Sequence, residues 1–256
     1  MILLNSLLAW FGDPTHWTGT GGVPNRLLQH LYISGVALLI GCVIALPLGA
    51  YVGHTGRGSF MIVGVANGVR ALPELGLLYL FALALGVGTP LPAYFALAIL
   101  AIPPVMAGTY AGVRNVDRSV VDAARGMGMR EQQVLFKVEL PNALPLILSG
   151  LRAAAFQVIA TAAIAAFIAQ GGLGRYLQDG FRRQQYGEMA AGALLVAVLA
   201  LVVEGLLLLV QFLAVSPGLR AGGGVRRSPT ANLAASEAES SPEVSTPEPE
   251  LAGVDR

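Results

Sequence analysis

Five runs of about 20 or more largely apolar residues constrain this chain more than any other feature of its sequence. A helix advances about 1.5 Å per residue, so a run of about 20 apolar residues is enough to cross a hydrocarbon core ~30 Å thick. We therefore predict an all-α, polytopic membrane protein with five transmembrane helices. The runs are residues 27–52, 59–86, 91–113, 144–169 and 189–213.

The composition supports the same class. Asp, Glu, Lys and Arg make up 12% of the chain, whereas a soluble domain carries about 25% of them. The mean hydropathy is +0.66. The formal net charge of +1 also excludes a nucleic-acid partner bound through phosphate neutralisation, because such proteins concentrate excess Lys and Arg on one face.

The two ends differ from the apolar core at 27–215. Residues 1–26 hold an apolar stretch too short to span, and Trp10, Phe11 and Trp17 suit the headgroup layer. We expect this segment to be external and to lie at the membrane interface. Residues 216–256 are rich in Gly, Pro, Ser, Ala and Glu and lack periodicity, which predicts a disordered cytoplasmic tail.

The basic residues predict the orientation of the spans. Cytoplasmic loops carry an excess of Lys and Arg, and most of these residues lie in the third loop and the tail. The predicted orientation is N-terminus outside and C-terminus in the cytoplasm, with Arg175, Arg182 and Arg183 in the outer loop 170–188 as exceptions. The residues that favour it are Arg114, Arg118, Arg125, Arg130, Lys137, Arg220, Arg226 and Arg227.

Charged and helix-breaking residues inside the predicted spans are candidates for the pathway or for structural ion pairs. Arg70 and Glu74 are four residues apart, so on a helix they would share a face, and Pro73 lies between them. Both a pathway lining and a structural kink remain open. Arg152 and Glu204 lie at similar depth in the last two spans, and we predict that they form a structural ion pair rather than a substrate contact.

The loop at 114–141 carries helical content of its own. Ser119 and Asp122 have the spacing of a capping box, which would start a helix there. Gly128 permits a bend, and a second helix would follow with Val134 and Val138 on one face. Pro141 is expected to end it.

Within this loop the residues resemble a known motif. Every fixed position of the pattern E-A-A-x3-G-x9-I-x-L-P is filled, with Asp for Glu and Val for Ile. The residues are Asp122, Ala123, Ala124, Gly128, Val138, Leu140 and Pro141. This pattern is similar to the EAA loop of permease subunits of bacterial ABC importers. The resemblance extends over about residues 27–213, where the sequence is similar to the permeases for glycine betaine, carnitine and choline. Two of the segments that carry it are VANGVRALPELGLLYLFALALGVGTP and VELPNALPLILSGLRAA.

The resemblance implies a type I importer fold and a set of partners. The loop would be the coupling helix that docks on an ATP-binding subunit, present in two copies, which uses ATP and Mg. The permease would pair with a second copy or a relative and receive solute from an extracytoplasmic binding protein in a bacterial cell membrane. No cofactor is expected on this chain, and methionine or another amino acid remains the alternative substrate.

Other function classes lack support in the sequence. The only lysine, Lys137, follows Phe136, so a P-loop is absent, and no hydrolase motif occurs. We therefore expect no enzyme activity in this chain. A channel would need no docking loop, and the scattered histidines predict no metal site. Gly171, Gly172 and Gly174 form either an outer gate or a simple chain reversal after the fourth span.

Overall fold

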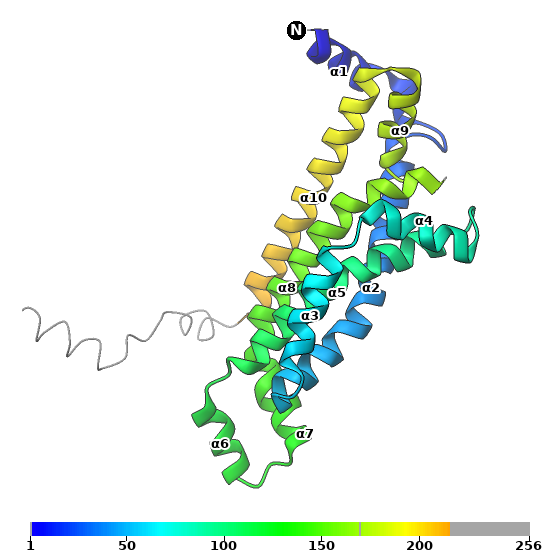
Figure 1. Cartoon of the computed structure of the whole chain (residues 1–256). Coiled ribbons are helices and arrows are strands. Elements are labelled where there is room, and N and C mark those ends of the chain that lie inside the picture. Colours follow the sequence, from blue (N-terminus) through cyan, green and yellow to red (C-terminus); the bar gives the residue numbers. More distant parts are fainter. Residues whose placement is uncertain (1, 169, 216–256) are drawn as a thin grey trace, which may run out of the picture.

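The computed structural model describes residues 2–168 and 170–215, so the predicted disorder of 216–256 lies outside the described residues. The described residues contain helices and no strand. Figure 1 shows a long bundle with two small helices, α6 and α7, at one end, which we call the loop end, and with α1 and α9 at the other. The elements are α1 (Ile2–Gly12), η1 (Pro14–Trp17), α2 (Val23–Thr55), α3 (Ser59–Arg70), α4 (Glu74–Leu85), α5 (Leu91–Arg114), α6 (Arg118–Gly126), α7 (Glu131–Val134), η2 (Leu135–Glu139), α8 (Leu140–Thr161), η3 (Ala162–Ile168), α9 (Gly174–Arg183) and α10 (Tyr186–Ala214).

Four of the described helical stretches are long and apolar enough to cross a membrane. They are Val23–Thr55, Leu91–Arg114, Glu131–Ile168 and Tyr186–Ala214. The remaining predicted span, 59–86, is divided into α3 and the shorter apolar helix α4, which points away from the bundle axis (Figure 1). The three residues between them are not helical, so the expectation that Arg70 and Glu74 share a helix face is wrong. Pro73 is the physical reason, since it disfavours a helical conformation in the residue before it.

The centre of the bundle is held by close backbone contacts of α5 with α2 and α8. A Cβ atom built on Gly108 of α5 would lie 2.7 Å from the Leu146 carbonyl oxygen, and one on Gly150 of α8 would lie 2.6 Å from that of Pro104. On the other side of α5, a Cβ on Gly49 of α2 would meet the Met106 carbonyl oxygen at 2.8 Å. In a bilayer no hydrophobic force drives helices together, so such close van der Waals packing is what holds them.

Small residues recur every four positions along α2 and make this packing possible. Gly41, Ala45, Gly49 and Gly53 are all buried and face α5. In contrast α10 exposes most of its apolar surface, with Leu201 64% exposed. Helices that are buried on one side and apolar on the other are expected where lipid covers the outside.

Two features at the end opposite the loop end were not predicted, the helix α9 and the burial of Trp10. Residues 174–183, expected to be part of an outer loop, form α9, which packs against α10. Trp10 was expected in the headgroup layer, but it is 8% exposed and packs edge-on against Tyr176 of α9, with ring centroids 5.1 Å apart. Helix α9 has only ten residues, which is too short for its amphipathic pattern to be recognised in the sequence, so its buried face is evident only from the tertiary packing. Trp17 remains 43% exposed.

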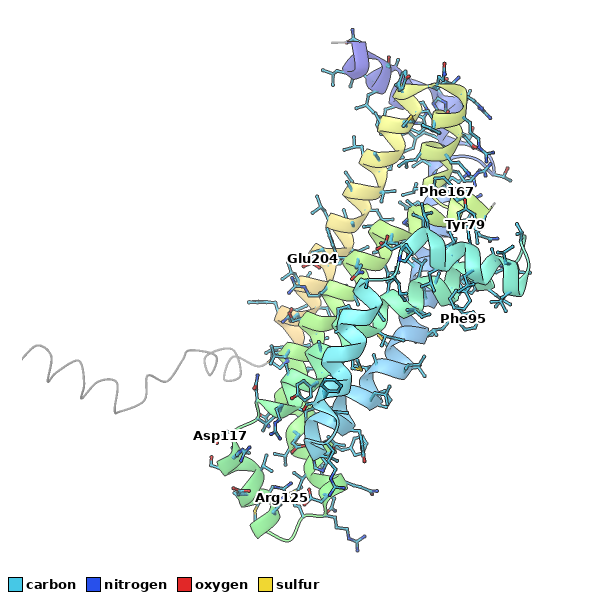
Figure 2. All side chains as sticks on the ribbon, in the orientation of Figure 1. Tyr79, Phe95, Asp117, Arg125, Phe167 and Glu204 are labelled. Carbon is cyan, nitrogen blue, oxygen red and sulfur yellow. The ribbon has the colours of Figure 1, made fainter. Side chains whose placement is uncertain are left out.

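An ion pair joins α8 to α10 near the middle of these helices. The Arg152 guanidinium donates hydrogen bonds to Glu204, one of them at 3.1 Å from Nε, so the two residues pair as their matched depths predict (Figure 2 labels Glu204). Gln211 was missed by the sequence analysis. Its amide oxygen accepts from Arg152 at 2.7 Å, and its amide nitrogen donates to the Pro145 carbonyl at 3.0 Å.

We predict that Arg152→Leu and Glu204→Leu each destabilise the protein by about 3–5 kcal/mol, because each leaves a charge without its partner in a dry interior. The double variant should lose much less than the sum. Gln211→Leu serves as a control that removes a hydrogen bond to the Arg152 guanidinium without removing either charge of the pair, and it should cost about 1.5–3 kcal/mol. Thermal unfolding in detergent and abundance in membranes measure these effects.

If the losses of the two single variants simply add in the double variant, the pair contributes nothing as a pair. If the double variant is stable but no longer transports, the pair belongs to the pathway instead of the scaffold.

Candidate coupling site

The segment that matches the importer motif folds as a compact unit at the loop end of the bundle. Helix α6 begins after Asp117, whose Oδ1 accepts hydrogen bonds from the Ser119 backbone N–H and hydroxyl, each at 2.9 Å. The predicted capping box of Ser119 with Asp122 is therefore wrong. Asp117 already occupies the capping position, two residues before Ser119, and the Ser119 hydroxyl donates to its carboxylate. Asp122 instead lies on the exposed face of α6 (Figure 2 labels Asp117 and Arg125).

Gly128 makes the turn that closes this unit. Its φ is +85°, its N–H donates to the Arg125 carbonyl at 2.9 Å, and the Met129 N–H donates to the Ala124 carbonyl at 3.2 Å. This pair of bonds is the Schellman ending of a helix, which places a left-handed residue just past the end. Glycine adopts that conformation without the steric cost of a Cβ, so the bend expected at Gly128 is present and explained.

A small apolar core holds the two halves of the unit together. Val121 and Ala124 of α6 are buried against Val134 of α7, with Val138 half-buried beside them. Ala124 was expected to face a docking partner, but it is 2% exposed and faces this core. Its neighbour Ala123 is exposed. Successive helix positions differ by about 100°, so the two alanines of the motif serve different faces.

The unit is also tied to the bundle by charged groups. Arg125 donates to both carboxylate oxygens of Glu131, at 3.0 and 2.9 Å, and these bonds raise the pKa of the Arg125 guanidinium. His54, near the end of α2, lies 3.3 Å from Glu131 through Nε2 and 2.5 Å from Glu139 through Nδ1. Glu139 is 5% exposed. The result is a chain of contacts from α6 through α7 to α2.

Sequence reasoning missed this chain of contacts. His54 was considered only as a possible metal ligand, and Glu139 occupies a variable position of the motif. A signal was available in the sequence, because Glu139 lies at the start of a predicted span, where a carboxylate needs a partner.

The chain does not break where the unit joins the span. Residues Leu135–Glu139 form a π-helical turn, and the Leu140 N–H donates to the carbonyl five residues earlier. The expectation that Pro141 ends the helix is wrong, since α8 continues through it. Proline donates no backbone hydrogen bond, and the wider π-helical turn leaves room for the Pro141 ring. The side-chain amide of Asn142 donates a hydrogen bond to the Val138 carbonyl at 2.7 Å, so this carbonyl has a partner.

The remaining motif residues occupy distinct positions in this unit. Val138 and Leu140 are half-buried, and Pro141 is exposed. Asp122, Ala123, Met127 and Gly128 form the exposed face of the α6 turn, and Met127 is 77% exposed. Asp122 also lines a polar cavity of about 270 Å³ between α6 and the ends of α2 and α5, together with Arg114, Arg118 and Glu139. An exposed tip that carries a large apolar side chain, Met127, beside a polar cavity is a surface suited to docking.

The three glycines after the fourth span pack on neighbouring elements at the opposite end of the bundle, Gly171 and Gly172 on α2 and Gly174 on η3. The Gly172 N–H donates to Gln29 at 3.0 Å, and the Leu173 N–H donates to His30 at 3.3 Å. A Cβ on Gly174 would overlap the Ala163 carbonyl, at 2.0 Å. The segment thus makes close contacts with η3 and α2 where the chain passes from the fourth span to α9. Whether it also gates remains a prediction.

The charges of the divided span lie apart from the coupling unit. Arg70 ends α3, Pro73 precedes α4, and Glu74 is the first residue of α4 with an exposed side chain. The Arg70 side chain lies outside the described residues. Among the described residues no three His, Cys, Asp or Glu side chains gather as a metal site would require.

Comparison with known proteins places these features in a family. Residues 37–221 match the model of the binding-protein-dependent transport system inner membrane component. A carnitine transport permease of Listeria monocytogenes is 39% identical over 176 residues, covering 69% of this chain and 80% of the relative. A glycine betaine/carnitine/choline transport system permease of Bacillus subtilis is 33% identical over 203 residues, covering 79% and 93%.

A solved structure agrees in fold. One chain of the methionine ABC transporter MetNI, in an inward-facing conformation, superposes with a TM-score of 0.63 at 23% identity, covering 82% of this chain and 98% of that one. The similarity supports the arrangement of helices and nothing finer. With the family match over most of its length, this chain belongs to the inner membrane components of binding-protein-dependent transport systems.

Proposed function

We propose that this chain is the membrane-spanning subunit of an ATP-driven importer of osmoprotectants such as glycine betaine, choline, carnitine or proline. The coupling unit at the loop end carries the proposal, because it fills the importer motif and also folds as a compact body with an exposed tip. The relatives named above are permeases for carnitine, glycine betaine and choline, which supports this solute class. The methionine transporter resembles this chain in fold only, so methionine is the weaker alternative.

The proposed assembly has two permeases, two ATP-binding subunits and an extracytoplasmic binding protein. The exposed face of α6, with Asp122, Ala123 and Met127, would dock in the ATP-binding subunit. ATP hydrolysis belongs to that subunit, which uses Mg. The permease pairs with a second copy or with a relative. Closure of the ATP-binding pair would favour one of two arrangements of the spans and so alternate access to the solute.

The structure suggests how motion at α6 would reach the spans. Arg125 bonds to Glu131 of α7, which continues without a break into α8, and His54 connects Glu131 and Glu139 to α2. A displacement of α6 therefore acts on two spans at once. The close contacts of α5 with both spans would transmit it across the bundle.

The proposed orientation places the loop end and the C-terminus in the cytoplasm and α1 and α9 outside. Docking on a cytoplasmic ATPase requires the loop end to be inside. The basic residues of 114–141 favour the same orientation. The bundle geometry is consistent with it, because α6 and α9 lie at opposite ends (Figure 1).

We predict that Gly128→Ala weakens coupling through backbone strain alone. A Cβ at Gly128 meets no atom within 4 Å, but the positive φ makes any non-glycine residue unfavourable by about 1–2 kcal/mol. Gly128→Asn should be milder, since asparagine tolerates this conformation. The matched control is Gly126→Ala, which has equal space and a helical backbone. Solute-stimulated ATPase activity and uptake in proteoliposomes give the measurement.

Full uptake by Gly128→Ala, or equal losses at positions 126 and 128, would contradict the importance of this turn. Gly128→Asp adds a charge at the tip. It should abolish uptake while the protein still inserts, and normal uptake with normal assembly would remove the docking assignment.

The orientation can be tested by cysteine labelling. In a variant whose single native Cys42 is replaced by Ala, a cysteine at Arg118 should be shielded from an impermeant thiol reagent in intact cells. A cysteine at Arg182, exposed at the end of α9, should be labelled. Labelling of position 118 from outside would overturn both the orientation and the docking role of α6, and lysed cells provide the control in which both positions react.

A further inference from the structure

A small polar cavity lies where the divided span meets α5 and α8. It has a volume of about 140 Å³ and is lined by Glu74 at the start of α4 and by Gln157 of α8. Apolar residues of α3, α5 and the break make up much of the rest, among them Val69, Leu72 and Leu100. Water occupies about 30 Å³ per molecule, so the space suits a few waters or one small headgroup.

The polar groups of this cavity differ from those of the α8–α10 ion pair. Arg152 donates hydrogen bonds to both Glu204 and Gln211, and the Arg152–Glu204 pair compensates both charges. Among the described side chains neither Glu74 nor Gln157 has a hydrogen-bond or ion-pair partner. Glu74 has an exposed side chain in the single chain, and an ionisable group within a spanning region without a structural partner is a functional candidate by default.

The backbone of α5 adds acceptors to the same place. Pro103 and Pro104 are consecutive residues inside α5, and both line the cavity. Proline has no N–H, so Pro104 cannot donate the helical hydrogen bond to the Leu100 carbonyl, and Leu100 is among the residues that line the cavity. Discontinuous helices at mid-depth expose backbone acceptors in many transporters, and carboxylate and carbonyl oxygens both favour a positive group.

We propose that Glu74, Gln157 and the Leu100 carbonyl form a transient site for the cationic ammonium group of the solute as it crosses the membrane. The proposal rests on the proposed function and deepens it, since it assigns the positive end of the solute to one place in the chain. Glu74 supplies the charge, and Gln157 supplies an amide oxygen from the opposite helix. The apolar lining suits methyl groups, which a quaternary ammonium carries and an inorganic cation lacks.

The test uses the complete transporter with its binding protein in proteoliposomes, at saturating binding protein, with choline and glycine betaine as solutes. Choline carries a single positive charge, whereas glycine betaine carries its own carboxylate, which Glu74 repels. Glu74→Gln should lower the turnover of choline about tenfold or more, as expected for loss of a bond to a charged group. The turnover of glycine betaine should fall by less than about threefold.

Graded and matched variants accompany this measurement. Glu74→Asp keeps the charge and should retain most choline transport. Gln157→Leu should shift the choline-to-betaine ratio in the same direction. Glu188→Gln removes a carboxylate from the first turn of α10, outside this cavity, and should leave the ratio unchanged. Thermal unfolding of each variant shows whether it still folds.

Several outcomes would overturn the inference. Glu74→Gln with unchanged turnover, or with equal losses for both solutes in a folded protein, would remove the site while leaving the proposed function intact. If Arg70→Gln reproduces the loss for both solutes alike, Glu74 serves a structural pair instead. If the wild-type transporter moves neither solute, the proposed function fails, and the inference fails with it.

Discussion

The close approach of α5 to α2 and α8 is the constraint on which the rest of this structure depends. Gly108 and Gly150 bring the two backbones so near that no Cβ fits between them, and the glycines of α2 do the same on the other side. In lipid this packing replaces the hydrophobic effect that holds a soluble core. It fixes three helices as one body, and the coupling unit, the divided span and α10 are all placed relative to that body.

The polar contacts act on top of this packing and join the peripheral parts to it. His54 ties the coupling unit to α2 through Glu139, and Arg152 ties α10 to α8 through Glu204. Arg152 and Glu204 pair charges that would be costly alone within the spans, and Glu139 is 5% exposed, so an unpaired carboxylate there would be costly in the protein interior. Because such contacts require both partners, they also define which helices move together. The coupling unit is thereby linked to α2 and α8, the same two spans that α5 contacts.

The division of the second predicted span shows how one local rule shapes the interior. Pro73 separates α3 from α4, and the consecutive prolines of α5 lie across the cavity from the break. Helix breakers are expensive in a membrane unless neighbours or water meet the freed backbone groups. Their presence on two adjacent helices, around an acidic side chain, concentrates polar atoms at one point of an otherwise apolar bundle.

The sequence by itself determined the class of fold, four of the spans as long helices, the break near Pro73, the bend at Gly128 and the pairing of Arg152 with Glu204. These features follow from local chemistry: run length, missing N–H groups, positive φ and the cost of a lone charge. Only the tertiary structure decided that Asp117 caps α6, that Ala124 faces inward, that the helix passes through Pro141, and that Trp10 is buried by α9. It also brought His54 to Glu139 across 85 residues. Each of these depends on which surfaces meet after folding, and a one-dimensional pattern carries no information on contacts between distant segments.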